Sequence, residues 1–288
     1  MKIVDCGPQR SETWKSYRRT KIMASEVAAI MGESPWQTAE DVFMEKLGLG
    51  KERVVSAAMQ QGIDLESTAL AMLNKMVGYE FKPCVVESVD HPHLGASLDG
   101  FYGEMEPFRA ICEIKCVTSK KGLMDAIHGI VPKHYAIQMQ TQLICSEADL
   151  CFYCVYFEGD IAVVEVRPDP EMQARIIDET KTFWERVQNL EPPEPKYVER
   201  DDQDWLIAVA NLTALQRDIK LLQDRESEAK ARLIELSDGK STKGYGMGVI
   251  HSVRAGTVDY SKLCEENKID AAKYRKEPTQ VVTVRKVK

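Results

Sequence analysis

The stretch Ser97-Leu98-Asp99-Gly100, followed after a hairpin-length gap by Cys112-Glu113-Ile114-Lys115-Cys116, decides how this chain is interpreted. Both runs alternate like strands, and Asp99 is expected at the end of the first strand, beside a turn glycine. Because side chains alternate between the two faces of a strand, Glu113 and Lys115 share one face while Ile114 packs on the other. Two carboxylates and an ammonium can therefore converge on one point.

This set of groups suits a hard divalent cation. Mg²⁺ prefers a few carboxylates, keeps several waters and leaves room for phosphate oxygens. Lys115 can then orient or deprotonate an attacking water while the cation stabilises the charge that develops on a phosphate. The alternative is an ordinary Glu113–Lys115 pair on the surface of an edge strand, because the Glu-x-Lys triplet is common.

Composition indicates a globular protein with one large domain, or a domain plus an appendage. The chain has 288 residues, 44% hydrophobic and 29% charged. The N-terminal segment lacks the apolar core of a signal peptide, and no apolar run reaches the length of a membrane helix. We therefore expect a cytoplasmic protein with no membrane partner.

The net charge of −7 argues against a nonspecific DNA coat, but the charge is uneven. Residues 1–25 and residues 273–288 each carry six lysines and arginines, and acidic residues dominate between them. A basic rim around an acidic, metal-filled centre suits a protein that attracts phosphates, although ordinary surface scatter gives the same counts. The eight cysteines are expected to be buried thiols. Cys151 and Cys154 lie in a strand-like run and face opposite sides, so no zinc or iron–sulphur role is expected.

Hydrophobic periodicity predicts helices and strands in mixed order along the first part of the chain. The expected helices are 11–31 with a break, 38–48, 54–77, 121–129, 133–146 and 170–189. The expected strands are 84–89, 94–102, 108–117, 150–157 and 161–167. This order predicts an α/β domain, residues 1–190, with a central mixed β-sheet flanked by helices.

Residues 191–198 begin with Glu191-Pro192-Pro193-Glu194-Pro195 and are predicted to be a linker. Residues 199–288 form a C-terminal extension of a different kind. Trp205, Leu212, Ile219, Glu226 and Leu233 are spaced by seven, and a second set falls three residues after each, as in a long heptad-patterned helix. The glycines at 244, 246 and 248 are predicted to be a turn rather than a phosphate cradle. Strands near 249–254 and 281–287 are expected to flank a short helix near 260–266.

Further polar residues have the chemistry to join the Asp99 centre. Glu66, on the long helix, can supply another carboxylate. Gln138, one turn beyond Tyr135, can hydrogen-bond a water or phosphate oxygen. Arg18 and Ser25, near two helix ends, can hold a phosphate by charge and amide groups. Each is equally compatible with an ordinary solvated or capping residue when taken alone.

The order of these motifs resembles the YqaJ-type viral recombinase family, whose members are lambda-exonuclease-like nucleases of the PD-(D/E)XK superfamily. The resemblance covers about residues 10–190. It runs through Arg18…Ile22-Met23-Ala24-Ser25-Glu26, Gly62-x-x-x-Glu66, Ser97-Leu98-Asp99-Gly100, Glu113-Ile114-Lys115 and Tyr135-x-x-Gln138-x-Gln140. It implies a restriction-endonuclease-like core and Mg²⁺-dependent degradation of one strand of duplex DNA from its 5′ end, with Mn²⁺ able to substitute.

The resemblance also implies roles for individual residues. Asp99, Glu113 and the backbone carbonyl of Ile114 would bind metal, with Glu66 completing the acidic cluster. Lys115 would position the nucleophilic water, assisted by Gln138.

The remaining implied roles concern the DNA. Arg18 and Ser25 would form the 5′-phosphate pocket, with Tyr135 close by. Met59 falls where the family places an apolar wedge that splays the strands.

The chain departs from the family pattern in one respect, because Leu98 stands where a proline usually precedes the aspartate. That proline is geometric rather than chemical, so the site should survive. The implied partners are ends of double-stranded DNA, a single-strand annealing protein and further copies of the chain in a trimeric ring. Alternatives are a related endonuclease, an iron–sulphur exonuclease, or a non-catalytic DNA-binding adaptor that uses the heptad helix.

Overall fold

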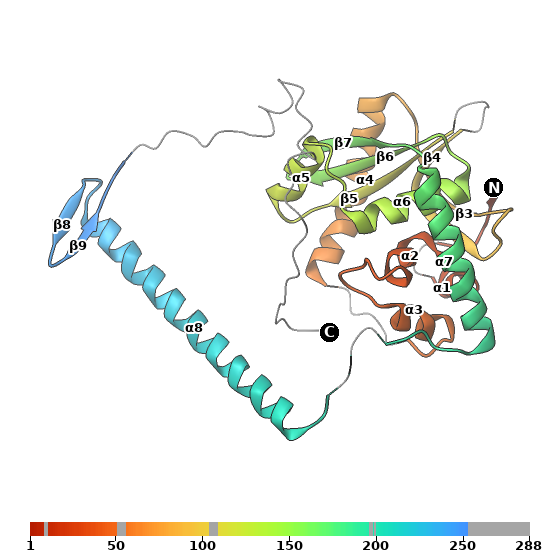
Figure 1. Cartoon of the computed structure of the whole chain (residues 1–288). Helices are drawn as coiled ribbons and strands as arrows, with labels where there is room; N and C mark the ends of the chain where they lie inside the picture. Colours follow the sequence, from red (N-terminus) through yellow and green to blue (C-terminus); the bar gives the residue numbers. More distant parts are fainter. Residues whose placement is uncertain (9–10, 51–55, 104–108, 196–197, 199, 253–288) are drawn as a thin grey trace. The chain divides into compact units, whose positions relative to one another are not determined.

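A computed structural model describes residues 1–8, 11–50, 56–103, 109–195, 198 and 200–252 (Figure 1). The chain divides into two compact units, Met1–Val198 and Glu199–Lys288. Among the described residues, no helix is both long and apolar enough to span a bilayer. The predicted strand 281–287 and helix 260–266 lie outside the described residues.

The first unit is built on one mixed sheet with helices on both faces, as predicted (Figure 1). Its strands are β1 (Lys2–Ile3), β2 (Ile22–Met23), β3 (Lys82–Glu87), β4 (Leu94–Tyr102), β5 (Ala110–Cys116), β6 (Leu150–Phe157) and β7 (Asp160–Val166). Its helices are α1 (Glu12–Arg19), α2 (Ala24–Ile30), α3 (Ala39–Lys46), α4 (Ala57–Val77), α5 (Lys120–Ile127), α6 (Lys133–Ser146) and α7 (Pro170–Asn189). The two-residue strands β1 and β2 were not predicted, because two residues carry no periodicity.

The pairing order is β1-β3-β4-β5-β6-β7, with β2 parallel to β4. Neighbouring strands from β3 to β7 are antiparallel except β5 and β6, which are parallel. Parallel neighbours need a crossover connection, and α5 with α6 supplies it. α6 packs on the sheet and contacts β4 and β5, and β5 carries the Glu-x-Lys triplet.

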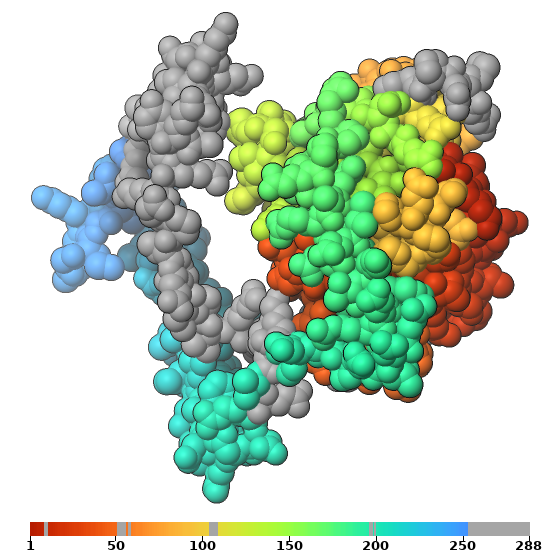
Figure 2. Space-filling view, turned by 45° about the vertical axis from the view of Figure 1, so that its right-hand side comes forward, coloured from red at the N-terminus to blue at the C-terminus, as the bar shows by residue number. Residues whose placement is uncertain are grey.

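Two apolar cores lie on the two sides of the sheet. One contains Ile111 of β5 and side chains of α2 and α6, and the other contains Cys112 and Ile114 of β5 and side chains of α4. Figure 2 shows α7 in green across one face of the first unit, and α7 packs on α2 and α6. Cys151 and Cys154 fall in different cores, so the C-x-x-C spacing places the two thiols on opposite sides, as expected.

Gly100 was predicted as a turn glycine, and this is wrong. Asp99 and Gly100 lie within β4, where Gly100 pairs with Cys112 of β5. A Cβ at position 100 would meet the Phe81 Cβ at 2.5 Å and the Cys112 Sγ at 2.6 Å. Glycine is therefore required by close packing between neighbouring strands and not by a turn.

The second unit contains α8 (Gln203–Leu236), capped by Asp202, whose side chain accepts from the Trp205 N–H at 3.0 Å. The helix is the predicted heptad-patterned one, and none of its residues is buried. Glu226, the exception to the apolar pattern, pairs with Lys230 at 2.6 Å.

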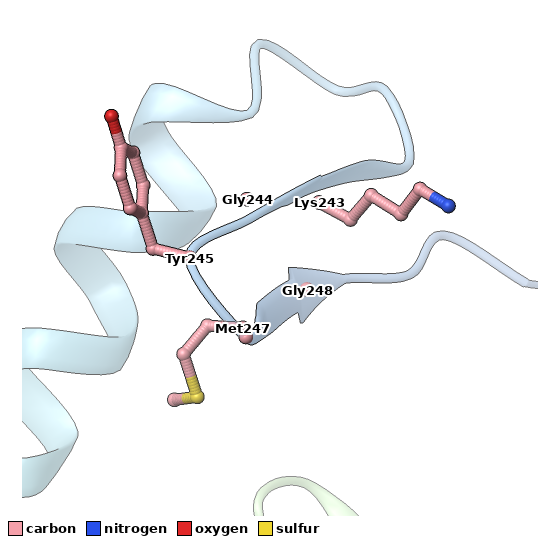
Figure 3. Close-up of a pocket in the computed structure, with 6 residues that line it drawn as sticks. Lys243, Gly244, Tyr245, Met247 and Gly248 are labelled. Atoms are coloured by element: carbon pink, nitrogen blue, oxygen red, sulfur yellow. The ribbon is translucent and has the colours of Figure 1, made fainter.

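β8 (Thr242–Gly244) and β9 (Met247–Val249) follow as a hairpin. Tyr245 and Gly246 at its turn both have positive φ, as two-residue hairpin turns require. The predicted turn is confirmed. The strand expected at 249–254 begins earlier and ends at Val249. Figure 3 shows Tyr245 and Met247 projecting from this hairpin, around a hollow whose lining contains no carboxylate, imidazole or thiol.

His93 ties β4 to α7. It lies just before β4, and its Nε2 is 3.1 Å from Thr180 Oγ1 on α7. Burial, together with His91 and Lys21, lowers the pKa of His93 to about 4. The imidazole is therefore neutral in the folded protein at neutral pH.

Acid is expected to weaken the first unit through this histidine. The unfolded chain takes up a proton near pH 6.5, whereas the folded chain resists until about pH 4. The contribution of neutral His93 to stability is complete above about pH 6.5 and is lost as the pH falls towards 4. His93→Gln should show a smaller fall in the free energy of unfolding across this range, measured by urea denaturation. The exposed His128, changed to Gln, is the control and should follow wild type; equal acid sensitivity in both variants would contradict the assignment.

Candidate active site

Glu113 is the centre of a buried hydrogen-bond cluster. Its Oε1 accepts from Lys115 Nζ at 2.5 Å and from Gln138 Nε2 at 2.7 Å. Its Oε2 accepts from Gln142 Nε2 at 2.5 Å. Glu113 and Gln142 are 2% and 0% exposed. A buried carboxylate is tolerated only when paired and hydrogen-bonded, and here both of its oxygens have partners.

Two secondary-structure periods produce this cluster. Glu113 and Lys115 are two apart on β5 and so share a face. Gln138 and Gln142 are four apart on α6 and so lie one above the other on its inner side. The crossover places that side of α6 over β5, so Lys115 of β5 and Gln138 and Gln142 of α6 all contact the Glu113 carboxylate.

Asp99 joins the cluster from β4. Its Oδ2 accepts from the Ile114 N–H at 2.8 Å, which places the carboxylate beside β5. Burial, the charge of Glu113 and, to a smaller degree, Glu66 on α4 raise the pKa of Asp99 well above its usual range. Although burial opposes it, the charges of Glu113 and Asp99 raise the pKa of Lys115 above its ordinary value. Lys115 is therefore an ammonium in this state.

The predicted set is thus largely brought together. Glu113, Lys115 and Gln138 are joined by hydrogen bonds, and Asp99 is attached to the same strand through the Ile114 N–H. The Lys115 ammonium lies 4.7 Å from the Tyr135 ring centroid. The charge of Glu66, on α4, raises the pKa of Asp99. Within the described part of the chain, no three His, Cys, Asp or Glu side chains are arranged as a metal cage.

Arg18 is held in place by a second buried ionic cluster. Glu26, 3% exposed, pairs with Lys46 Nζ at 2.6 Å and with Arg18 Nη2 at 3.0 Å. Although burial favours the neutral carboxyl, these two cations lower the pKa of Glu26. Arg18 also donates to Ser25 Oγ at 3.3 Å and stacks over Trp14 at 4.7 Å. Two cations share one carboxylate, which leaves a net positive charge beside the exposed Ser25.

A cation–π contact and two hydrogen bonds connect the two clusters. The Trp14 indole N–H donates to Ser97 Oγ on β4 at 3.4 Å. Gln142, in turn, donates to the Ser97 backbone carbonyl at 3.4 Å. Trp14 and Ser97 thus link the Arg18 guanidinium to the residues that hold Glu113. Met59 lies in the first turn of α4, with half of its surface exposed.

Sequence reasoning missed three residues here: Trp14, Lys46 and Gln142. The signal for Gln142 is present, because it lies four residues after Gln138 on the same helix face. Gln140, part of the predicted motif, has a structural role instead. It donates to the Arg167 carbonyl at 2.7 Å and accepts from the Asp169 N–H at 2.9 Å, which joins α6 to the start of α7.

Both clusters lie in a segment of the chain that matches a known family of domains. Residues 13–149 match the YqaJ-like viral recombinase domain, and they include every member of both clusters. The matched segment covers just under half of the chain. The YqaJ-like domain therefore starts in α1 and ends just before β6, so β6, β7 and α7 complete its fold from outside the matched segment.

Comparison with solved structures finds several that are similar to part of this chain. An alkaline exonuclease (LHK-Exo) from Laribacter hongkongensis is similar at 24% identity and a TM-score of 0.55, over 63% of this chain and 94% of that one. The structure of LHK-Exo in complex with dAMP gives the same values. A phage-related exonuclease from Haemophilus somnus has 15% identity and a TM-score of 0.46, over 61% and 97% of the two chains. No curated protein matches.

Gln142→Leu should destabilise the protein because it leaves one oxygen of a buried carboxylate without a donor. The expected loss in the free energy of unfolding is about 1–3 kcal/mol, measured by urea denaturation. The double variant with Glu113→Gln should lose less free energy of unfolding than the sum of the two single variants. In the double variant, the buried group left without a donor is a neutral amide rather than a carboxylate. Strict additivity would mean that the two side chains are not energetically coupled.

Proposed function

We propose that the protein is a Mg²⁺-dependent exonuclease that degrades one strand of linear double-stranded DNA in the 5′-to-3′ direction. The product would be a duplex with a 3′ single-stranded tail, suited to recombination by single-strand annealing. The observation that carries the proposal is the Glu113 carboxylate, fixed by Lys115, Gln138 and Gln142 beside Asp99. The match to the YqaJ-like family and a fold shared with an alkaline exonuclease support it.

The donor set fits a hard cation. Burial and the charges of Glu113 and Glu66 raise the pKa of Asp99, so an added positive charge would favour its ionised form. Asp99, Glu113 and the Ile114 carbonyl would hold Mg²⁺, with Mn²⁺ as a substitute and Glu66 acting at a distance. Mg²⁺ usually takes one or two protein carboxylates and completes its shell with water and phosphate. When bound, the cation would stabilise the negative charge that develops on the attacked phosphate.

Lys115 and Gln138 would arrange the reacting groups. An ammonium donates hydrogen bonds and cannot accept a proton, so Lys115 in this state would orient the water and offset phosphate charge. Gln138, held on Glu113 by its amide N–H groups, would assist near that water. The ring face of Tyr135 would keep the Lys115 ammonium in place through a cation–π contact.

Arg18 and Ser25 would bind the terminal 5′ phosphate. The guanidinium is fixed by Glu26 and Trp14, so binding a phosphate would cost little side-chain entropy. LHK-Exo has been solved with dAMP, a 5′ nucleoside monophosphate, and this chemistry is the kind that Arg18 would recognise here. Met59 would serve as the apolar wedge between strands. The proposed partners are duplex ends, a single-strand annealing protein, and two further copies in a ring that would keep the enzyme on its DNA.

The direct test is a gel assay on a linear duplex with each strand labelled separately, in Mg²⁺ with and without EDTA. Loss of one strand from its 5′ end, abolished by EDTA, is the expected result. Internal cuts would indicate an endonuclease instead. A mobility shift without degradation would indicate a non-catalytic DNA-binding protein.

Lys115→Ala should reduce the single-turnover rate by roughly 10²–10⁴-fold, the usual contribution of a residue that positions or activates water. DNA binding, measured by fluorescence anisotropy, should change little. Lys121→Ala is the matched control, since it removes an 82%-exposed lysine that pairs with Asp125 on α5. Turnover close to wild type in Lys115→Ala would exclude the role proposed for this lysine.

Arg18→Ala should weaken binding and degradation of 5′-phosphorylated ends more than of 5′-hydroxyl ends. A guanidinium gains most from a doubly charged terminal phosphate. Arg19→Ala removes the same charge from the neighbouring exposed position and should affect both ends alike. Equal losses on both ends in Arg18→Ala would make Arg18 a general backbone contact or a structural residue.

A further inference from the structure

An unexplained aromatic cluster lies next to the candidate active site. Trp36 is in the loop between α2 and α3 and is 63% exposed. Its ring centroid lies 4.8 Å from that of His134, in an edge-on arrangement, and 6.1 Å from that of Tyr135, tilted by 36°. Tyr135 is the ring on which the Lys115 ammonium lies. The aromatic cluster therefore runs from the catalytic ammonium to the surface, where it ends in an open indole.

The exposed ring is held in place by its surroundings. Ser34 Oγ accepts from the backbone N–H groups of Trp36 and Gln37, each at 3.2 Å, which fixes the loop. His134 and Tyr135 are consecutive residues at the start of α6 and contact each other at 4.2 Å between centroids. Burial and the nearby Lys115 lower the pKa of His134, so its ring is neutral and adds no charge to the cluster. An indole held this way loses little freedom when something stacks on it.

Exposing most of an indole to water is unfavourable without a ligand, because tryptophan brings the largest apolar surface of any side chain. The residues beside Trp36 indicate which class of ligand would cover its ring. A phosphodiester that reaches Lys115 carries a nucleobase a few ångströms away, and Tyr135 contacts both the Lys115 ammonium and the Trp36 ring. Bases stack on aromatic rings without regard to sequence, which suits an enzyme that must remove every nucleotide in turn.

We propose that Trp36, supported by His134 and Tyr135, is a stacking platform for the unpaired nucleobase at the strand end being degraded. The inference rests on the proposed function and adds to it a subsite for the base, separate from the Arg18 subsite for the phosphate. Stacking would hold the terminal nucleotide away from its partner strand and orient its phosphodiester towards Lys115. The contact is to the π face, so it distinguishes a base from no base rather than one base from another.

The test measures binding of short duplexes with a 5′ phosphate, in Ca²⁺ in place of Mg²⁺, with a gel to confirm that the DNA stays intact. One duplex has normal bases, and others have a single abasic site at the first or second nucleotide of the 5′ end. Trp36→Ala should weaken binding of the normal duplex by roughly 5- to 100-fold, the range of one base–aromatic stack. It should change binding by less than about 2-fold when the stacked base is already missing. A 2-aminopurine at that position should be quenched by wild type and not by Trp36→Ala.

Two conservative variants separate stacking from packing. Trp36→Phe keeps a π face and should retain most of the base-dependent affinity. Trp36→Leu keeps an apolar contact with His134 but has no π face, and should behave like Trp36→Ala. Met76→Ala, at a similarly exposed apolar residue near the end of α4, is the control and should bind both duplexes as wild type does.

The outcomes separate this inference from the proposed function. If wild type degrades the duplex but the Trp36 variants lose affinity equally on normal and abasic ends, or lose none, the stacking platform is overturned and the nuclease stands. Equal behaviour of Trp36→Leu and Trp36→Phe would also overturn it, since packing would then explain the effect. If wild type neither binds nor degrades linear duplexes, the proposed function itself fails.

Discussion

The structure of the site depends on keeping one carboxylate charged inside the protein. Glu113 lies almost fully out of water, and burying an ionised carboxylate without partners costs several kcal/mol at least. Lys115, Gln138 and Gln142 offset that cost by hydrogen bonds to both oxygens. Strand alternation places Lys115. Helix periodicity and the packing of α6 on β5 together place Gln138 and Gln142.

The same constraint organises the surroundings. Asp99 places a second carboxyl group beside Glu113, and burial together with the Glu113 charge raises the pKa of Asp99. Although burial opposes it, the two acidic residues raise the pKa of Lys115. Around Arg18 the balance is reversed, since Lys46 and Arg18 share Glu26 and leave a positive excess. The domain thus places an acidic cluster that favours a cation near a basic cluster that favours an anion. Ser97 on β4 contacts both, through Trp14 on one side and Gln142 on the other.

Features that follow from the helix or strand periodicity of the sequence were predicted correctly. Features that depend on contacts between distant segments were not. The spacing of Glu113 and Lys115 fixed their common face, and the run 133–146 matched α6. Gln142 was missed because a glutamine in a helix is usually a surface residue, and only packing against β5 makes it a buried donor. Gly100 was misread because a glycine beside an aspartate suggests a turn, whereas Phe81 and Cys112 exclude a side chain there. Trp36 belongs to none of the predicted motifs, since the exposure of a side chain cannot be read from sequence.

The crossover that builds the site also sets when the site can exist during synthesis. Glu113 and Gln142 are 29 positions apart, and Gln142 comes later in the chain. A nascent chain that has left the ribosome only as far as β5 exposes Asp99, Glu113 and Lys115 but neither glutamine. The carboxylate then has no helix over it and stays hydrated. Because α6 must dock before Glu113 can be enclosed, a growing chain carries its acidic residues in an unassembled form. The complete constellation arises only after the crossover has closed, late in the translation of the first unit.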